Sequence, residues 1–185
     1  VQAFTATAFA FTNNLSCSTK TLSGSGTSFT LTIANCTTGT SGSVTLSANA
    51  IRDLAGNYAL ATASTRIITV DTVAPTASFT TKPGSYTSLA TQHYTITFSE
   101  SVTGMASGKI TLGGTGCQIA NYTATSATVY DFDVVNCSSG ATSTVTLAAN
   151  AGTDAAGNIG PATTVANSTL VDTVAPTVSS WTTSM

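Results

Sequence analysis

Apolar and polar residues alternate in short stretches along this chain. Residues 129–135 read VYDFDVV, in which every second side chain is apolar. A period of two is that of a β-strand with one buried face, and residues 29–33, FTLTI, show the same alternation. The predicted core positions are Phe29, Leu31, Ile33, Tyr130, Phe132 and Val134. Asp131 and Asp133 are then outer-face residues in solvent, a reading we favour over a catalytic carboxylate pair.

Further stretches of this kind follow one another, separated by clusters of Gly, Asn, Ser and Pro. They are ASFTT (77–81), HYTITFSE (93–100), KITL (109–112), STVTLAA (143–149) and NSTLV (167–171). Ser and Thr are abundant and β-branched and aromatic residues are frequent, which favours strands over helices. Strands at this spacing are typical of a β-sandwich, so we predict an all-β fold.

The chain also repeats itself at a distance of about 100 residues. VTLSANAIRDLAGN (44–57) matches VTLAANAGTDAAGN (145–158), and DTVAPT occurs at 71–76 and again at 172–177. A repeat of this length indicates tandem domains, with DTVAPT as the junction between them. The predicted division is 1–71, an incomplete repeat lacking its first strands; 72–171, a complete repeat; and 172–185, the first strand of a third repeat or a donor-type tail.

The junction and the incomplete repeat each lead to an expectation. Pro75 and Pro176 fix φ and hold the preceding residue extended, which predicts a stiff linker. Val1 matches Val102, so the strands equivalent to 77–81 and 93–100 are missing from the first repeat. They are supplied by preceding sequence, have been lost to a cut, or are donated by a neighbouring chain; these three explanations remain open.

Charge and motif content exclude several classes of function. Only 6 % of residues are charged, with five basic and seven acidic side chains and a formal net charge of −2, so we expect neither nucleic acid nor anionic membranes as partners. We expect no membrane insertion, because no apolar run approaches about 18 residues, and the start of the chain resembles an internal excerpt or a processed product rather than a signal peptide. The only histidine is His93, and no nucleophile, zinc-protease or phosphate-loop motif occurs, so we expect no enzyme. LGGTGC (112–117) reads as a hairpin loop.

Four cysteines fall at repeat-equivalent places, one pair in each half of the chain. The pairs are Cys17 with Cys36 and Cys117 with Cys137. Metal binding would call for CxxC-like spacing or nearby histidines, so disulfides are the favoured interpretation, with buried free thiols as the alternative. Each bridge would close a loop of about 20 residues and contribute roughly 3 kcal/mol. Disulfides indicate an oxidising compartment and hence export.

A second repeated element is D-x-A-G-N, at 53–57 and 154–158. Asp and Gly at this spacing are typical of a tight turn. Four of the seven acidic residues stand at repeat-equivalent places, however, and hard oxygen ligands converging at a domain end would suit Ca²⁺. The candidate ligands are Asp53, Asn57, Asp71, Glu100, Asp154, Asn158 and Asp172. A plain turn and a calcium site both remain open, and no other cofactor is required.

FSESV (98–102), the 145–158 block and the recurring DTVAPT together resemble the bacterial immunoglobulin-like repeats of large surface adhesins and secreted matrix proteins. The resemblance covers essentially the whole chain. It implies seven-stranded sandwiches in tandem, an extracellular or cell-surface location, a role as spacer or fibre, and in some members calcium at the junctions. The residues that match are Asp53, Gly56, Asn57, Asp71, Asp154, Gly157, Asn158 and Asp172. The cysteine pairs depart from the commoner cysteine-free members.

The partners expected on this basis are neighbouring repeats of the same chain, other copies in a filament, or a ligand on a host or matrix surface. Two alternative functions are a filament subunit that polymerises by strand donation and a carbohydrate- or ligand-binding module. The candidate contact residues for a ligand are the aromatic side chains of Tyr58, Tyr86, Tyr122 and Trp181.

Overall fold

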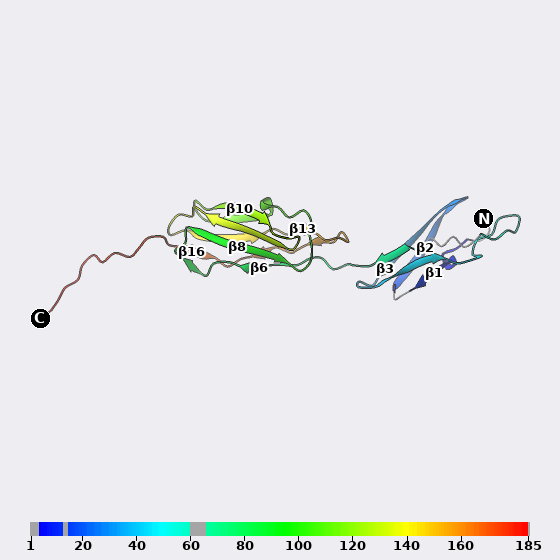
Figure 1. Ribbon diagram of the computed structural model, residues 1–185, viewed down its shortest axis with the longest axis horizontal. Coiled ribbons are helices and arrows are strands. Elements are labelled where there is room, and N and C mark those ends of the chain that lie inside the picture. The colour runs from blue at the N-terminus through cyan, green and yellow to red at the C-terminus, as the bar shows by residue number, and fades with distance from the viewer. Residues whose placement is uncertain (1–3, 13–14, 60–65, 185) are drawn as a thin grey trace. The chain divides into compact units, whose positions relative to one another are not determined.

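The computed structural model describes residues 4–12, 15–59 and 66–184 (Figure 1). The chain divides into two compact units, Val1–Val73 and Ala74–Met185. Strands dominate both units, and helix is limited in the described residues to two short 3-10 turns, η1 (Ala6–Ala8) and η2 (Ser107–Lys109). The predicted all-β class is therefore confirmed. The finer predicted division into three segments stays a prediction.

The second unit contains two main sheets. The first has the strand order β10-β11-β8-β6. In the second, β12 pairs antiparallel with β9, β15 and β16, and β16 pairs in parallel with β7. The bounds are β6 (Ala77–Thr81), β7 (Tyr86–Thr87), β8 (Thr91–Phe98), β9 (Ile110–Gly113), β10 (Gln118–Ala124), β11 (Val129–Val135), β12 (Thr142–Leu147), β15 (Thr164–Val165) and β16 (Thr169–Val171). A separate small ribbon joins β13 (Gly152–Thr153) to β14 (Ile159–Gly160).

Both sheets of the second unit contribute side chains to one hydrophobic core, which is the arrangement of a β-sandwich. The first sheet provides Tyr94 and Phe132, whose rings stack with centroids 5.2 Å apart. Val145 and Leu147 come from β12 in the second sheet, and all four side chains are fully buried. Alternate residues of each strand therefore point inward, as the sequence pattern predicted for β11.

The described residues of the first unit form fewer strands than the second unit has, and they bury little apolar surface. β1 (Phe9–Thr12), β4 (Ser41–Leu46) and β5 (Arg66–Thr69) form one antiparallel sheet, and β2 (Cys17–Ser25) and β3 (Ser28–Cys36) form a hairpin. Among its described apolar residues only Ala8 and Val44 are buried. The predicted core positions of β3 lie on one face but remain half-exposed.

The pairing among β1, β4 and β5 recurs among β9, β12 and β16 at an offset of 101 positions, whereas β2–β3 and β10–β11 differ in register. Phe9 pairs with Leu46 between β1 and β4, and Ile110 pairs with Leu147 between β9 and β12. The pairing of β4 with β5 has the same register as that of β12 with β16. Asparagines with positive φ recur at the same offset; they are Asn35, Asn49, Asn136 and Asn150. The two units therefore share backbone geometry as well as sequence.

The prediction of a hairpin loop at 112–117 is wrong. β9 pairs with β12 and β10 pairs with β11, so this segment crosses from one sheet to the other. Gly114 has φ +115°, and a Cβ there would lie 2.8 Å from the sulfur of Cys117. The glycines thus permit a tight crossover beside a disulfide.

Candidate functional site

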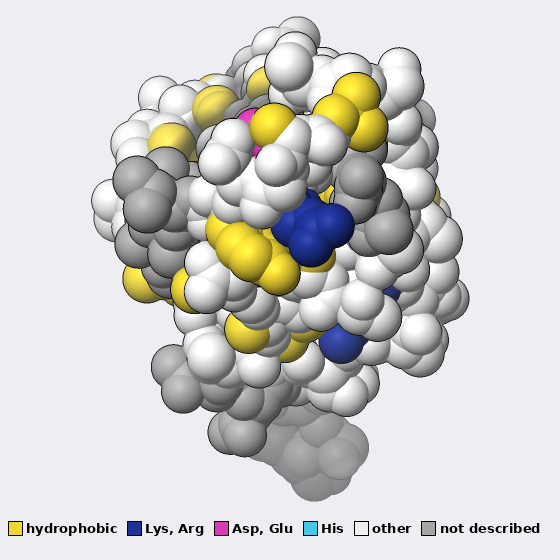
Figure 2. Space-filling view, turned by 90° about the vertical axis from the view of Figure 1, so that its right-hand side faces the viewer, with side chains coloured by type: hydrophobic (Ala, Val, Ile, Leu, Met, Phe, Trp, Pro, Cys, Tyr) yellow, Lys and Arg dark blue, Asp and Glu magenta, His cyan; other side chains and the backbone are white. Residues whose placement is uncertain are grey.

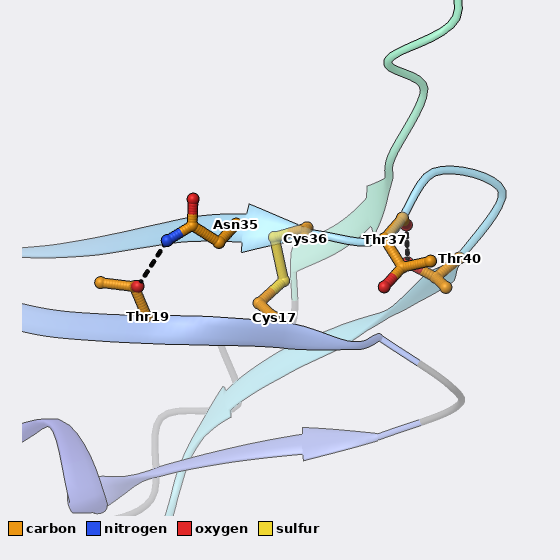
Figure 3. Close-up of a disulfide and its surroundings, with 6 residues drawn as sticks. All are labelled: Cys17, Thr19, Asn35, Cys36, Thr37 and Thr40. Carbon is orange, nitrogen blue, oxygen red and sulfur yellow. Dashed lines mark hydrogen bonds between the residues drawn. A yellow bond between two sulfur atoms is a disulfide. The ribbon is translucent and has the colours of Figure 1, made fainter.

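Both predicted cysteine pairs are disulfide-bonded. Cys17 and Cys36 face each other across the β2–β3 hairpin with their Cα atoms 3.9 Å apart (Figure 3). Beside this bridge, the amide of Asn35 donates a hydrogen bond to the Thr19 hydroxyl at 2.8 Å. The second bridge, between Cys117 and Cys137, packs against the core of the second unit. No described cysteine is free, which fits an oxidising compartment.

The two D-x-A-G-N elements are turns closed by their own aspartates. The backbone N–H and side-chain amide of Asn57 each donate to Asp53 at 2.8 Å, and Gly56 takes φ +97°. These hydrogen bonds lower the pKa of Asp53, and the bond from the Asn57 side chain has the largest effect. The predicted turn geometry is thus present in the first unit.

Asp154 repeats this arrangement in the second unit. Its carboxylate accepts hydrogen bonds from the backbone N–H groups of Ala156 and Asn158 and from the Asn158 side chain, at 2.8–2.9 Å. Burial alone would raise the pKa of Asp154, but these hydrogen bonds outweigh it and lower the pKa. The carboxylate is therefore ionised and already oriented at neutral pH.

Within the second unit a second carboxylate lies close to this turn. Glu100 follows β8, and its carboxylate oxygen lies within 4.8 Å of one of Asp154. Two carboxylates at this distance repel each other, and a cation between them would relieve that repulsion. Predicted calcium ligands Glu100 and Asp154 are thus brought together, whereas calcium binding itself stays a prediction.

Hydroxyl side chains fasten the start of DTVAPT to the unit before it, and the junction aspartate accepts a hydrogen bond from within DTVAPT. Asp71 accepts a hydrogen bond from the N–H of Val73, and the N–H of Thr72 donates to the Thr38 hydroxyl, both at 3.0 Å. Asp172 makes the corresponding contact in the second unit. In Figure 1, β13 and β16 lie at opposite ends of the second unit. β13 directly precedes Asp154, and β16 directly precedes Asp172. Asp172 is therefore remote from the Glu100–Asp154 pair.

A polar cluster that the sequence did not indicate lies on the outer face of the first sheet of the second unit. His93 Nδ1 lies 2.9 Å from Asp133 Oδ1, and Thr95 donates to Asp131 at 2.7 Å. Thr125 donates to the other oxygen of Asp131 at 2.5 Å. The predicted outer-face position of both aspartates is observed, but cross-strand partners rather than water alone solvate them. Only the register of β8 against β11 could have indicated this cluster.

The four aromatic candidates for ligand binding do not share one environment. Tyr58, Tyr86 and Trp181 are exposed, Tyr58 in the first unit and the other two in the second. Tyr122 packs against the core and stacks on Tyr130 with centroids 6.3 Å apart. A role as a carbohydrate-binding surface stays a prediction.

The first unit has an open apolar groove of about 520 Å³ between its hairpin and its three-stranded sheet. Its lining residues are Phe9, Leu31, Ile33, Val44, Leu46, Arg66 and Ile68. Figure 2 shows hydrophobic side chains at the surface of the first unit beside Lys or Arg side chains. The sequence predicted missing strands here, but it could not define the groove.

Comparisons with protein-family models, with curated proteins and with solved structures found no match. Among the described residues no helix has the length and apolar character that crossing a membrane would take.

Proposed function

We propose that this chain is a structural segment of a secreted or cell-surface protein, built from tandem immunoglobulin-like β-sandwich repeats of the bacterial adhesin and matrix type. Its role is that of a stiff spacer or filament element. The repeats of the same polypeptide are its immediate partners.

The observation that carries this proposal is the strand register that β1, β4 and β5 of the first unit share with β9, β12 and β16 of the second at an offset of 101 residues. The 3-10 turns and four left-handed asparagines, Asn35, Asn49, Asn136 and Asn150, recur at that offset. A chain that repeats its scaffold, rather than one loop or one cluster of reactive side chains, is typical of a protein whose task is length and mechanical continuity.

Two further features support a mechanical role. Each disulfide bridges the ends of one hairpin-like strand pair within one unit. A pulling force along the chain therefore cannot extend the residues between the two bridged cysteines. The N–H of Thr72 donates to the Thr38 hydroxyl of the first unit, and the N–H of Thr173 donates to the Ser139 hydroxyl of the second unit. Force would therefore enter each unit through hydrogen-bonded backbone.

Single-molecule extension of the full chain, held by its two ends, tests this function. We expect the second unit to resist force and then to open in one step. Reduction should lengthen that step by about 70 Å, because the chain from Cys117 to Cys137, a sequence separation of 20, then extends at roughly 3.6 Å per residue. A chain that lengthens without a resisting step would contradict the mechanical role.

A further inference from the structure

The groove of the first unit corresponds to the buried core of the second. Residues 101 positions beyond its lining include Phe132, Val134, Val145 and Leu147, each of which has an exposed fraction of 0 %. Of their four counterparts in the groove, only Val44 is buried. The same scaffold is therefore covered in one unit and open in the other.

In the second unit the cover is β8. This strand pairs antiparallel with β11 over seven registered residue pairs and places Tyr94 directly opposite Phe132. β11 thus has neighbours on both sides, β8 and β10. β3 is the counterpart of β11, and within the described residues it pairs only with β2. Its other edge offers unpaired backbone groups beside an apolar groove.

We propose that this groove is a docking site for an extended peptide segment that adds to β3 as an antiparallel strand. The segment carries large apolar side chains at three alternate positions, as β8 does with Tyr94, Ile96 and Phe98. Main-chain hydrogen bonds to β3 provide affinity, and the alternate side chains that enter the groove provide specificity. This inference rests on the equivalence of the two units, which belongs to the proposed function, but not on the mechanical role.

The C-terminal segment of a second copy is a poorer occupant. Its large apolar residues Val174, Val178 and Trp181 are exposed, and in a strand Trp181 would point to the face opposite to that of the two valines. On the face of Val178 the neighbouring positions are Pro176 and Ser180. Two valines would therefore enter the groove, whereas the corresponding space in the second unit holds the larger side chains of Tyr94, Ile96 and Phe98.

The outward face of the segment needs hydroxyl rather than charged side chains. In the second unit His93 and Thr95 of β8 contact Asp133 and Asp131. The counterparts of these aspartates on β3 are Thr32 and Thr30, which are exposed.

Fluorescence anisotropy with the full chain tests the proposal, with a labelled peptide of the sequence TQHYTITFS, residues 91–99, as probe. We expect saturable binding. A control peptide with serine in place of Tyr94, Ile96 and Phe98 should not bind. Ile68→Lys, which places a charge in the groove, should weaken binding at least roughly tenfold. The matched control Ile67→Lys lies on the same strand but faces solvent, with Ile67 76 % exposed, and should leave binding unchanged.

Amide hydrogen exchange on the unsubstituted chain gives a readout that does not depend on a variant folding. Peptide binding should slow exchange at alternate residues of β3, those whose N–H groups point away from β2. Absence of binding, equal binding of the serine peptide, or protection elsewhere than β3 would overturn the proposal. The proposal would also be overturned if sedimentation detected a dimer of the chain that Ile68→Lys abolishes and that the peptide does not dissociate. None of these results would affect the extension measurement, so the two proposals can fail separately.

Discussion

At the scale of single residues, the outer-face cluster of the second unit shows how a protein with few charges uses them. Hydrogen bonds from the hydroxyls of Thr125 and Thr95 hold the pKa of Asp131 below its ordinary value of 3.8, and the bond from Thr125 has the larger effect. Hydrogen bonds with the Asn121 amide and with His93 lower the pKa of Asp133, and the bond from Asn121 has the larger effect. Both carboxylates therefore stabilise the folded state only while they are ionised.

We predict that Asp131→Asn lowers the free energy of unfolding of the second unit by roughly 1 kcal/mol at neutral pH, because its hydrogen bonds to a charge become weaker. The folded-state pKa of Asp131 is lowered, so this contribution is present above about pH 4 and lost as the pH falls through the folded-state pKa. Urea unfolding at about pH 7 and about pH 2.5, followed by amide signals of the second unit, should show the difference shrink in acid. Thr30→Asn, at the counterpart position without a carboxylate, should have the same effect at both pH values.

At the scale of strands and sheets, the difference between the units comes from coverage rather than from sequence. Leu46 and Leu147 are the same residue at equivalent positions of β4 and β12, each opposite its counterpart partner, Phe9 or Ile110. Leu147 is fully buried under the first sheet of its unit, whereas Leu46 lines the open groove. The same side chain therefore makes different contributions to stability.

We predict that Leu147→Ala destabilises the second unit by about 2–5 kcal/mol, the range for a fully buried leucine. Leu46→Ala should destabilise the first unit by less than about 1 kcal/mol, because the groove already admits water to that side chain. Denaturant unfolding with amide signals assigned to each unit would measure both. Similar losses at the two positions would mean that the groove is closed in solution.

The strands most open to prediction were those with strict alternation. β6 and β11 have the predicted limits, since each has one apolar face against the core. β10 was not predicted, because its sequence QIANYTA does not alternate; its pairing shifts between Ala120 and Thr123, and Asn121 takes φ +51°. A bulge of this kind moves side chains from one face to the other and hides the period of two.

In the candidate site too, the features that depend on local sequence were predictable and those that depend on strand alignment were not. Disulfide partners and D-x-A-G-N turns depend on local spacing and repeat equivalence, so the sequence was sufficient to predict them. The His93 cluster and the proximity of Glu100 to Asp154 depend on how distant strands are aligned. No period or spacing in a single sequence encodes that alignment.

At the scale of the whole chain, the two units provide an internal comparison for calcium. Both have the aspartate turn, at Asp53 and at Asp154. Glu100, however, follows β8, and the first unit has no counterpart of β8 among its described strands. The second unit thus has a carboxylate pair where the first has a single turn carboxylate.

We predict that about 5 mM CaCl₂ stabilises the second unit by roughly 1–2 kcal/mol and leaves the first unchanged. This magnitude follows if the affinity is that of an extracellular module, in the range of about 0.1–1 mM. Thermal unfolding should show the transition of the second unit shift upward by several degrees, with a smaller shift in MgCl₂ because Mg²⁺ gives up its water less readily. Glu100→Gln should abolish the calcium shift and, in calcium-free buffer, should raise stability slightly because it removes a repulsion from Asp154. An equal calcium effect on both units, or none on either, would leave the aspartates with the role of turn formers alone.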